Sequence, residues 1–432
     1  MIEISQILLS FILFSLIITV PVNIFNYKMF VNKKFFNLDI ASFNLILNCN
    51  ILLLMSILPI SLRLYNTLFI FSYLIIFIYI YFIKNFKFNL LKNFIQFISI
   101  FFIIFFIIST NVASELNLGW DAKYFYYIKA LFFVEGQNFY DLNKFENIYH
   151  PHLGSFLWAF YWELLPSKIE YIGRLFYVFI TCFSIFYVCH KDLKYSLMSN
   201  IIFVSLMFLF YKYERFSGLQ EILIFSFLVI TSKFYSKILN INNKYFIIFS
   251  ILLCNLILWF KAEGIIYAII MIMLLNLNNK VFFKEKIYIN LSFLFIFFLK
   301  YLIYEISNNV MLEKTGHPYS INYFLDLNYQ FIIYKLKFIM SYLAYYILNN
   351  IFFISGILIL LILNFQKKKD AYIKIINFYF ILNIIFIISA YLFRDVEIEY
   401  SIRTTMERVI FTSSGFYVFL IINYFKSLNT NS

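Results

Sequence analysis

Charged residues are scarce in this chain, and that scarcity decides its class. Only 13% of the 432 residues are Asp, Glu, Lys or Arg, whereas 63% are hydrophobic. The mean hydropathy is +0.83. Because soluble globular proteins carry about twice that charged fraction, the composition excludes a soluble protein. It predicts a polytopic membrane protein with no soluble domain at either end.

Several other signals are missing. The first apolar segment lacks a small-residue cleavage site and starts next to the acidic Glu3, so we expect a retained helix rather than a removable signal peptide. No internal repeat is found. All four cysteines fall in apolar stretches, where a thiol behaves as a small hydrophobic group. They are Cys49, Cys182, Cys189 and Cys254. We therefore predict neither a disulfide nor a metal cluster from them.

Long apolar runs are what the chain has instead. A helix that crosses the bilayer needs about 20 mostly apolar residues. Thirteen such segments are predicted, at residues 4–24, 40–62, 66–83, 93–112, 170–189, 197–211, 219–234, 245–260, 264–276, 287–304, 349–365, 372–392 and 409–425. The expected fold is therefore an all-α, polytopic transmembrane helical bundle.

Lysines collect in every second loop between these segments. Positively charged loops stay on the cytoplasmic side, so the N-terminus is expected outside and the C-terminus inside. The formal net charge of +13 then reflects topology, and no nucleic-acid partner is predicted. Three parts are expected: N-terminal spans in residues 1–112, an extracytoplasmic loop with interfacial helices in 113–169, and a transmembrane bundle with polar outer loops in 170–432.

The polar residues that remain fall mostly on the predicted outer face, and the first group is Gly119-Trp120-Asp121-Ala122. The following segment, 121–134, has apolar residues at helical spacing, which predicts a helix along the membrane surface. Trp120 suits the interfacial aromatic belt. Asp121 has two interpretations: an N-cap of that helix, or a general base that takes a proton from an attacking hydroxyl or amine.

Two histidines follow in the same loop, with a rigid proline between them. His150 and His152 suit phosphate contact, proton transfer or metal ligation. Without a third ligand nearby, the metal signal is weak. The alternative is that they are ordinary surface residues of a turn before the next helix.

The next two polar groups contain opposite charges. Glu221 follows the turn residues Ser217-Gly218, so it acts either on the dipole of its helix or as a second acid that faces Asp121 or a bound cation. Lys261-Ala262-Glu263-Gly264 interrupts an apolar stretch. One turn does not hide both Lys261 and Glu263 from lipid unless they pair or line a cavity.

The last polar group, residues 394–408, holds three arginines in a chain with few others. Arginine suits bidentate recognition of phosphate. Arg408 stands directly before the final predicted span, where its side chain reaches either a lipid phosphate or simply the water interface. Together with the acids around them, these arginines indicate that the segment forms one wall of a binding site.

These motifs, in this order, resemble the GT-C superfamily of integral-membrane glycosyltransferases. The nearest likeness is to the bacterial branch of protein mannosyltransferases and the lipid A aminoarabinose transferase. The motifs are Gly119 to Ala122, His150 to Gly154, Ser217 to Glu221, Lys261 to Gly264, and Glu399 to Arg408. The resemblance covers residues 113–425. The first three spans look like an extension of the single helix that usually precedes the catalytic loop in this superfamily.

The resemblance implies transfer of a sugar from a polyprenyl-phosphate donor to an extracytoplasmic acceptor, with inversion. Asp121 and Glu221 match the family's two acids, although Glu221 is usually Asp in relatives. Lys261, Arg403 and Arg408 would stabilise the phosphate charge as the glycosidic bond breaks. The expected substrate-binding residues are Trp120, His150, His152, Lys261, Glu263, Arg403 and Arg408.

The implied location is a bacterial inner membrane, with the site on its outer face. The acceptor is a lipid, a glycan or a protein, and no cofactor is certain, although a divalent cation such as Mg or Mn remains an option. Three other functions fit the sequence less well: a transporter or flippase for lipid-linked sugars, a surface-polysaccharide polymerase or ligase, and a partner subunit that has lost catalysis.

Overall fold

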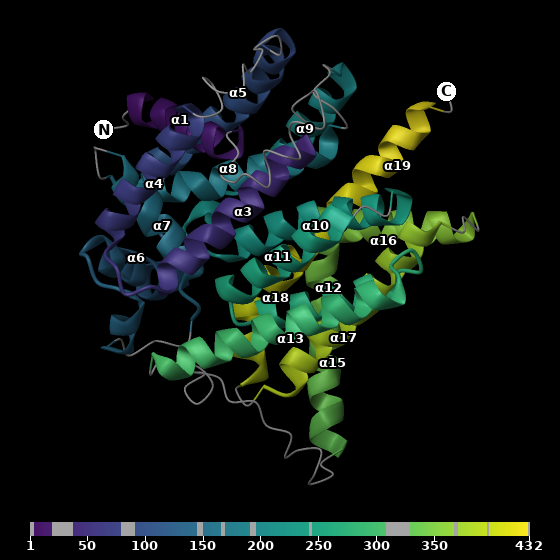
Figure 1. Cartoon of the computed structure of the whole chain (residues 1–432). Coiled ribbons are helices and arrows are strands. Elements are labelled where there is room, and N and C mark those ends of the chain that lie inside the picture. The colour runs from purple at the N-terminus through teal and green to yellow at the C-terminus, as the bar shows by residue number, and fades with distance from the viewer. Residues whose placement is uncertain are drawn as a thin grey trace. The chain divides into compact units, whose positions relative to one another are not determined.

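A computed structural model describes residues 4–19, 38–78, 91–144, 150–165, 169–190, 196–241, 244–307, 329–366, 370–394 and 397–430 of the chain. Helices dominate these residues, and no strand occurs among them (Figure 1). The expected all-α class is confirmed for this part of the protein. The four cysteines are free and buried.

The chain divides into two compact units. Unit 1 comprises Met1–Ser226, Trp259–Lys261 and Lys300–Asn309, and unit 2 comprises Phe227–Leu258, Ala262–Leu299 and Val310–Ser432. This division follows packing rather than membrane topology. The predicted three-part division at residues 112 and 169 stays a prediction.

Unit 1 contains the first helices of the chain. They are α1 (Ile4–Thr19), α3 (Leu38–Ile57), α4 (Leu62–Ile78), α5 (Leu91–Glu115), the π-helical turn η2 (Ala122–Tyr126), α6 (Tyr127–Val134), the 3-10 turn η3 (Phe139–Lys144), α7 (Leu153–Leu164), α8 (Glu170–Cys189), α9 (Leu197–Phe210) and the 3-10 turn η4 (Tyr213–Phe216). The helical segment expected after Asp121 is thus present as η2 and α6.

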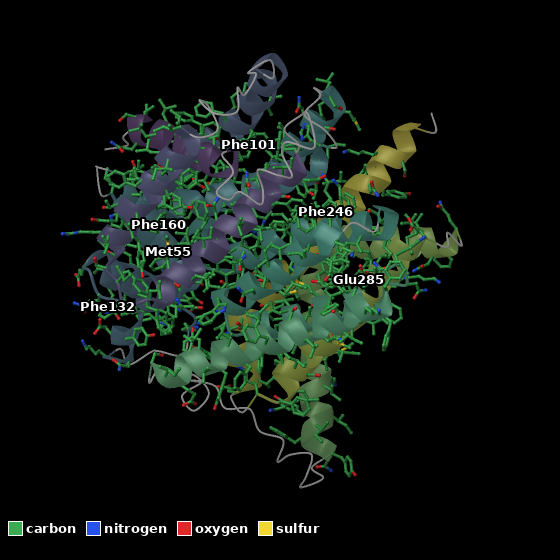
Figure 2. The ribbon with its side chains drawn as sticks, viewed as in Figure 1. Met55, Phe101, Phe132, Phe160, Phe246 and Glu285 are labelled. Carbon is green, nitrogen blue, oxygen red and sulfur yellow. The ribbon has the colours of Figure 1, made fainter. Side chains whose placement is uncertain are left out.

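Aromatic side chains fill the interior of unit 1. Tyr161 of α7 stacks on Phe176 of α8 with ring centroids 3.9 Å apart. Phe101 of α5, labelled in Figure 2, lies 5.4 Å from Phe179 of α8 between ring centroids. Large rings bury much apolar surface and favour such tilted and offset contacts. They fix α7 and α8, which lead out of the first loop, against the rest of the unit.

Helix ends in unit 1 are closed by side chains as well as by turns. The amide groups of Asn44 and Asn48 in α3 donate to the carbonyls of Ile18 and Ile17, each over 3.0 Å. The last carbonyls of a helix have no partner within it, so these two asparagines satisfy the end of α1. Their burial is thereby explained without a functional role.

Unit 2 contains the later helices. They are α10 (Glu221–Ile241), α11 (Lys244–Phe260), α12 (Gly264–Leu277), α13 (Phe283–Ile306), α15 (Tyr329–Asn349), α16 (Ile351–Phe365), α17 (Ala371–Leu392), α18 (Ile398–Ser414), the 3-10 turn η5 (Gly415–Tyr417) and α19 (Val418–Thr430). Of these, α10, α11 and α13 each have one end in unit 1. Side-chain oxygens cap two of them: Asn350 accepts from the Phe353 amide of α16, and Asp370 from the Tyr372 amide of α17.

Tyrosines tie the helices of unit 2 together. The ring of Tyr379 in α17 stacks on Phe416 at 4.1 Å, and its hydroxyl donates to the carbonyl of Ser413 over 2.8 Å. The hydroxyl of Tyr267 in α12 donates to the Val409 carbonyl over 3.2 Å. These bonds hold α12 and α17 against α18, the helix that carries the late arginines.

Seven helical segments in the described part of the chain are long and apolar enough to cross a membrane: α3, α8, residues 221–239 of α10, α13, α15, α17 and the continuous segment 398–427. Seven further apolar helices have 10–17 residues. Several of the long helices expose apolar faces, and on α13 Leu294 and Phe295 are 60% and 64% exposed. Lipid is the natural cover for such surfaces, and together these helices indicate a membrane protein.

One of these helices departs from the expected spans. α15 is 21 residues long, yet no span was predicted there because Lys335, Lys337 and several tyrosines lower the local hydropathy. The last predicted span, residues 409–425, lies within the continuous segment 398–427, which also includes residues 398–408 of the last polar group. The count of thirteen spans and the orientation stay predictions.

Candidate functional site

The clearest polar feature of unit 1 is a buried ion pair. The Lys261 ammonium Nζ lies 2.9 Å from the Glu221 Oε1, and the two residues are 7% and 4% exposed. Lys261 follows α11 directly, and Glu221 begins α10. The requirement that Lys261 pairs or lines a cavity is thus met by a carboxylate 40 residues earlier. Removal of either partner of so buried a pair would leave the other charge in the interior without compensation.

The turn before Glu221 has a conformation that requires glycine. Gly218 has φ of 91°, a region that side chains disfavour. A Cβ atom there would lie 2.7 Å from the Trp158 ring and 3.0 Å from the Ala122 Cβ. The turn is therefore pressed between α7 and the start of η2.

Asp121 lies beside this turn. The Gly119 amide donates to the Ser217 carbonyl over 3.0 Å, and the Lys123 amide donates back to the Gly119 carbonyl over 2.8 Å. Asp121 is half-buried and makes no capping hydrogen bond through its side chain. The N-cap interpretation therefore lacks its defining contact. The residues around Asp121, Glu221 and Lys261 come together within unit 1.

Trp120 lies on the outside of the same segment. It is 67% exposed, and its ring centroid is 5.0 Å from that of Tyr124 and 5.6 Å from that of Phe125. Phe125 in turn lies 4.6 Å from the ring of His150. This row of rings connects the first motif to the histidine motif.

His152 is not a surface residue. It is fully buried, and its Nε2 lies 2.8 Å from the Ser56 Oγ. The Ser56 hydroxyl donates its one proton to the Leu53 carbonyl over 2.7 Å. While that bond is made, the Ser56 oxygen accepts from His152, so Nε2 carries the imidazole proton and Nδ1 is an acceptor. Burial lowers the pKa of His152 well below its usual range, and the charges of Lys129 and Lys300 act in the same direction.

The two lysines near His152 were not singled out from the sequence. Lys129 is 2% exposed and donates to the His150 carbonyl, and burial lowers its pKa to about 7. Lys300 is 7% exposed, with its ammonium 5.6 Å from the Trp259 ring centroid. A lysine inside an apolar run, as at Lys300, was the available signal for such a residue.

The late arginines belong to unit 2, and they differ in their surroundings. Arg403 is exposed and forms an ion pair with Glu399, one turn away. Arg408 is half-buried, as is Glu263. Arg394, which was not chosen from the sequence, donates from Nη1 to the Ser401 and Thr405 hydroxyls over 2.8 and 3.3 Å.

In the described part of the chain, no group of three or more His, Cys, Asp or Glu side chains is placed to hold a metal ion. The optional Mg or Mn stays a prediction. No family model, curated protein or solved structure matches the chain. Membership of the GT-C superfamily therefore stays a prediction from the order of the motifs.

Proposed function

We propose that the protein is a membrane glycosyltransferase that moves a sugar from a polyprenyl-phosphate carrier to an acceptor. The observation that supports it most is the meeting of three motifs in unit 1. Gly119 and Ala122, on either side of Asp121, contact the turn that leads to Glu221, and Glu221 pairs with Lys261. A half-buried acid in the same unit as a buried charge pair supports a proton-transfer site.

In the proposed reaction, Asp121 acts on the acceptor. Its carboxylate takes the proton of the acceptor hydroxyl or amine as that atom attacks the anomeric carbon of the sugar. The new bond forms on the face opposite the bond that breaks, so the configuration inverts. The polyprenyl phosphate leaves with the electron pair of the broken glycosidic bond. No covalent enzyme intermediate is required.

The ion pair has a supporting role in this proposal. Glu221 holds the Lys261 ammonium in its charged form within a buried environment, because a neighbouring carboxylate favours the protonated amine. A fixed cation near the leaving phosphate stabilises the charge that develops there. Glu221 is then a positioning residue for Lys261 rather than a second base.

The proposed setting is the outer face of a bacterial inner membrane. The donor enters from the lipid phase, because a polyprenyl chain is soluble only there. Trp120, exposed beside Asp121, offers an aromatic surface on which the acceptor packs. The acceptor itself is a lipid, a glycan or a protein.

The experiment compares the purified parent with Asp121→Asn. Both receive polyprenyl-phosphate sugars and acceptors from a membrane extract, and the release of polyprenyl phosphate is measured. Asp141→Asn is the matched control, because Asp141 lies in the same loop and pairs with Lys144 over 2.8 Å. We expect release by the parent and by Asp141→Asn, and a loss of at least about 100-fold in Asp121→Asn, the size of a general-base contribution.

Two outcomes contradict the proposal. Equal release of polyprenyl phosphate by the parent and Asp121→Asn would show that Asp121 is not the general base. An absence of release from every protein, together with movement of the lipid-linked sugar across vesicles that contain the parent, replaces the transferase with a transporter.

A further inference from the structure

Unit 2 contains an arginine whose anchors are hydroxyl groups. Arg394 follows the end of α17 by two residues. Its Nη1 donates to Ser401 Oγ and Thr405 Oγ1, both on α18. Among the residues that the structure describes, no carboxylate forms an ion pair with it. Within this part of the chain, neutral hydroxyl groups therefore hold the guanidinium in place.

The Thr405 hydroxyl has no spare proton. Thr405 donates its proton to the Ser401 carbonyl over 2.7 Å, so its oxygen accepts from both Arg394 and the Tyr391 hydroxyl 2.8 Å away. The Arg394 Nε is buried and has no hydrogen-bond partner. One edge of the guanidinium, formed by Nε and Nη2, thus remains for an acceptor.

The helical phase of α18 explains why Arg394 rather than Arg403 has this environment. Ser401, Thr405 and Arg408 follow one another at spacings of four and three residues, which places them on one face of the helix. Arg403 is two residues from Ser401, so it lies on roughly the opposite face, where Glu399 neutralises it.

Positive charge accumulates around the same point. The Tyr391 hydroxyl lies within electrostatic range of the guanidinium groups of Arg394 and Arg408 and of one described carboxylate, Glu263. The Lys335 ammonium, on a residue 3% exposed, donates to the Arg394 carbonyl over 2.9 Å. An anchored guanidinium edge with a second guanidinium and an ammonium group nearby attracts a divalent oxyanion.

We propose that Arg394 binds a phosphate group through its Nε and Nη2 edge, with Arg408 and Lys335 adding to the attraction. Two parallel hydrogen bonds from this edge match two phosphate oxygens, which an ammonium group does not reproduce. The phosphate comes from a polyprenyl phosphate, from a bilayer phospholipid or from solution. Its assignment to the carrier lipid rests on the proposed glycosyltransferase function.

The test measures binding to the full-length protein in detergent, without turnover. The probes are a polyprenyl monophosphate, the same polyprenol without phosphate, phosphatidylglycerol and inorganic phosphate. The proteins are the parent, Arg394→Gln, Arg394→Lys and the matched control Arg403→Gln. Retained lipid is counted by native mass spectrometry, and inorganic phosphate is added as a competitor.

We expect Arg394→Gln to bind the polyprenyl monophosphate at least about 10-fold more weakly than the parent, the effect of losing charged hydrogen bonds. Arg403→Gln binds like the parent, and polyprenol binding is the same in all four proteins. Arg394→Lys keeps the charge and the fold but loses the bidentate edge, so it falls between the parent and Arg394→Gln. If Arg394→Gln does not fold, the test is the affinity of Arg394→Lys for the polyprenyl monophosphate compared with that of Arg403→Gln.

The probes separate the sources of phosphate. Equal binding of phosphatidylglycerol assigns the site to bilayer lipid, and displacement by inorganic phosphate assigns it to free phosphate. The proposal is overturned if Arg394→Gln or Arg394→Lys binds like the parent, or if Arg403→Gln is impaired equally. Specific binding of the monophosphate without any sugar transfer would support this inference and contradict the proposed function.

Discussion

The Lys261 ammonium and the Glu221 carboxylate lie 2.9 Å apart inside unit 1, each more than nine-tenths buried. Each charge is the principal reason that the other is tolerated in the interior. Two residues 40 positions apart therefore fix the end of α11 on the start of α10.

Removal of one partner leaves a buried charge without compensation. We expect Lys261→Met to destabilise the protein by roughly 3–5 kcal/mol, and the double variant Glu221→Gln with Lys261→Met to be less destabilised than Lys261→Met alone. Thermal unfolding in detergent measures both. Lys123→Met, at an exposed position of the same unit, is the control and leaves the midpoint unchanged. Additive losses in the double variant would show that the pair is not coupled.

Gly218 and Gly136 form a matched pair for the turn beside Asp121. Both have positive φ, 91° and 93°, but a Cβ at Gly218 meets the Trp158 ring at 2.7 Å, whereas none of the surrounding atoms lies within 4 Å at Gly136. We expect Gly136→Ala to cost about 1 kcal/mol from backbone strain alone. Gly218→Ala adds overpacking and costs roughly 2–4 kcal/mol in total. Equal thermal midpoints for the two variants would contradict the packing around Gly218.

Lys129 predicts a pH dependence of stability with a definite sign. Burial lowers its pKa from 10.5 to about 7. Between those values the unfolded chain binds a proton that the folded protein does not, so stability rises with pH by about 1.4 kcal/mol per pH unit at most. Below about pH 7 the contribution is constant.

The measurement compares thermal midpoints of the parent and Lys129→Met from pH 7 to pH 10. The substitution removes the titrating group, so the advantage of Lys129→Met over the parent should shrink as the pH rises. The lost hydrogen bond to the His150 carbonyl adds a constant offset at every pH. Parallel curves would mean that Lys129 is not buried as an amine.

The orientation in the membrane is open to direct measurement. Glu115 and Lys280 are exposed and are predicted on opposite sides, and the four native cysteines are buried. A membrane-impermeant maleimide should label Glu115→Cys but not Lys280→Cys in intact cells, and both after the cells are opened. The reverse pattern would invert the predicted topology and place Asp121 on the cytoplasmic side.

The sequence predicted the helical class because apolar runs of bilayer length have few other uses. It missed α15, where Lys335 and a series of tyrosines dilute an apolar helix. Periodicity did locate the helix after Asp121. Hydropathy does not tell which side chains are buried in the folded protein. Lys129 and Lys300 were therefore not predicted to be buried.

For the candidate site, the sequence indicated which segments contain polar groups, but it did not indicate which residues pair with one another. Lys261 was expected to pair or line a cavity, but Glu221 as its partner depends on how α10 meets α11, which no local pattern determines. The sequence predicted the arginine run only as a polar group before the final span. Had α18 been extended back to Ile398, its helical phase would have separated Arg403 from Arg408 and Ser401.

The Ser56 hydroxyl on α3 controls the chemistry of a ring 96 residues away. While its own proton points to Leu53, it accepts from Nε2 of His152 and so favours one of the two neutral forms of the imidazole. In that form Nδ1 is the acceptor, and it has no hydrogen-bond partner among the described residues. A change at position 56 alone, such as Ser56→Ala, would release the ring to exchange tautomers and so alter the reactivity of His152 without touching it.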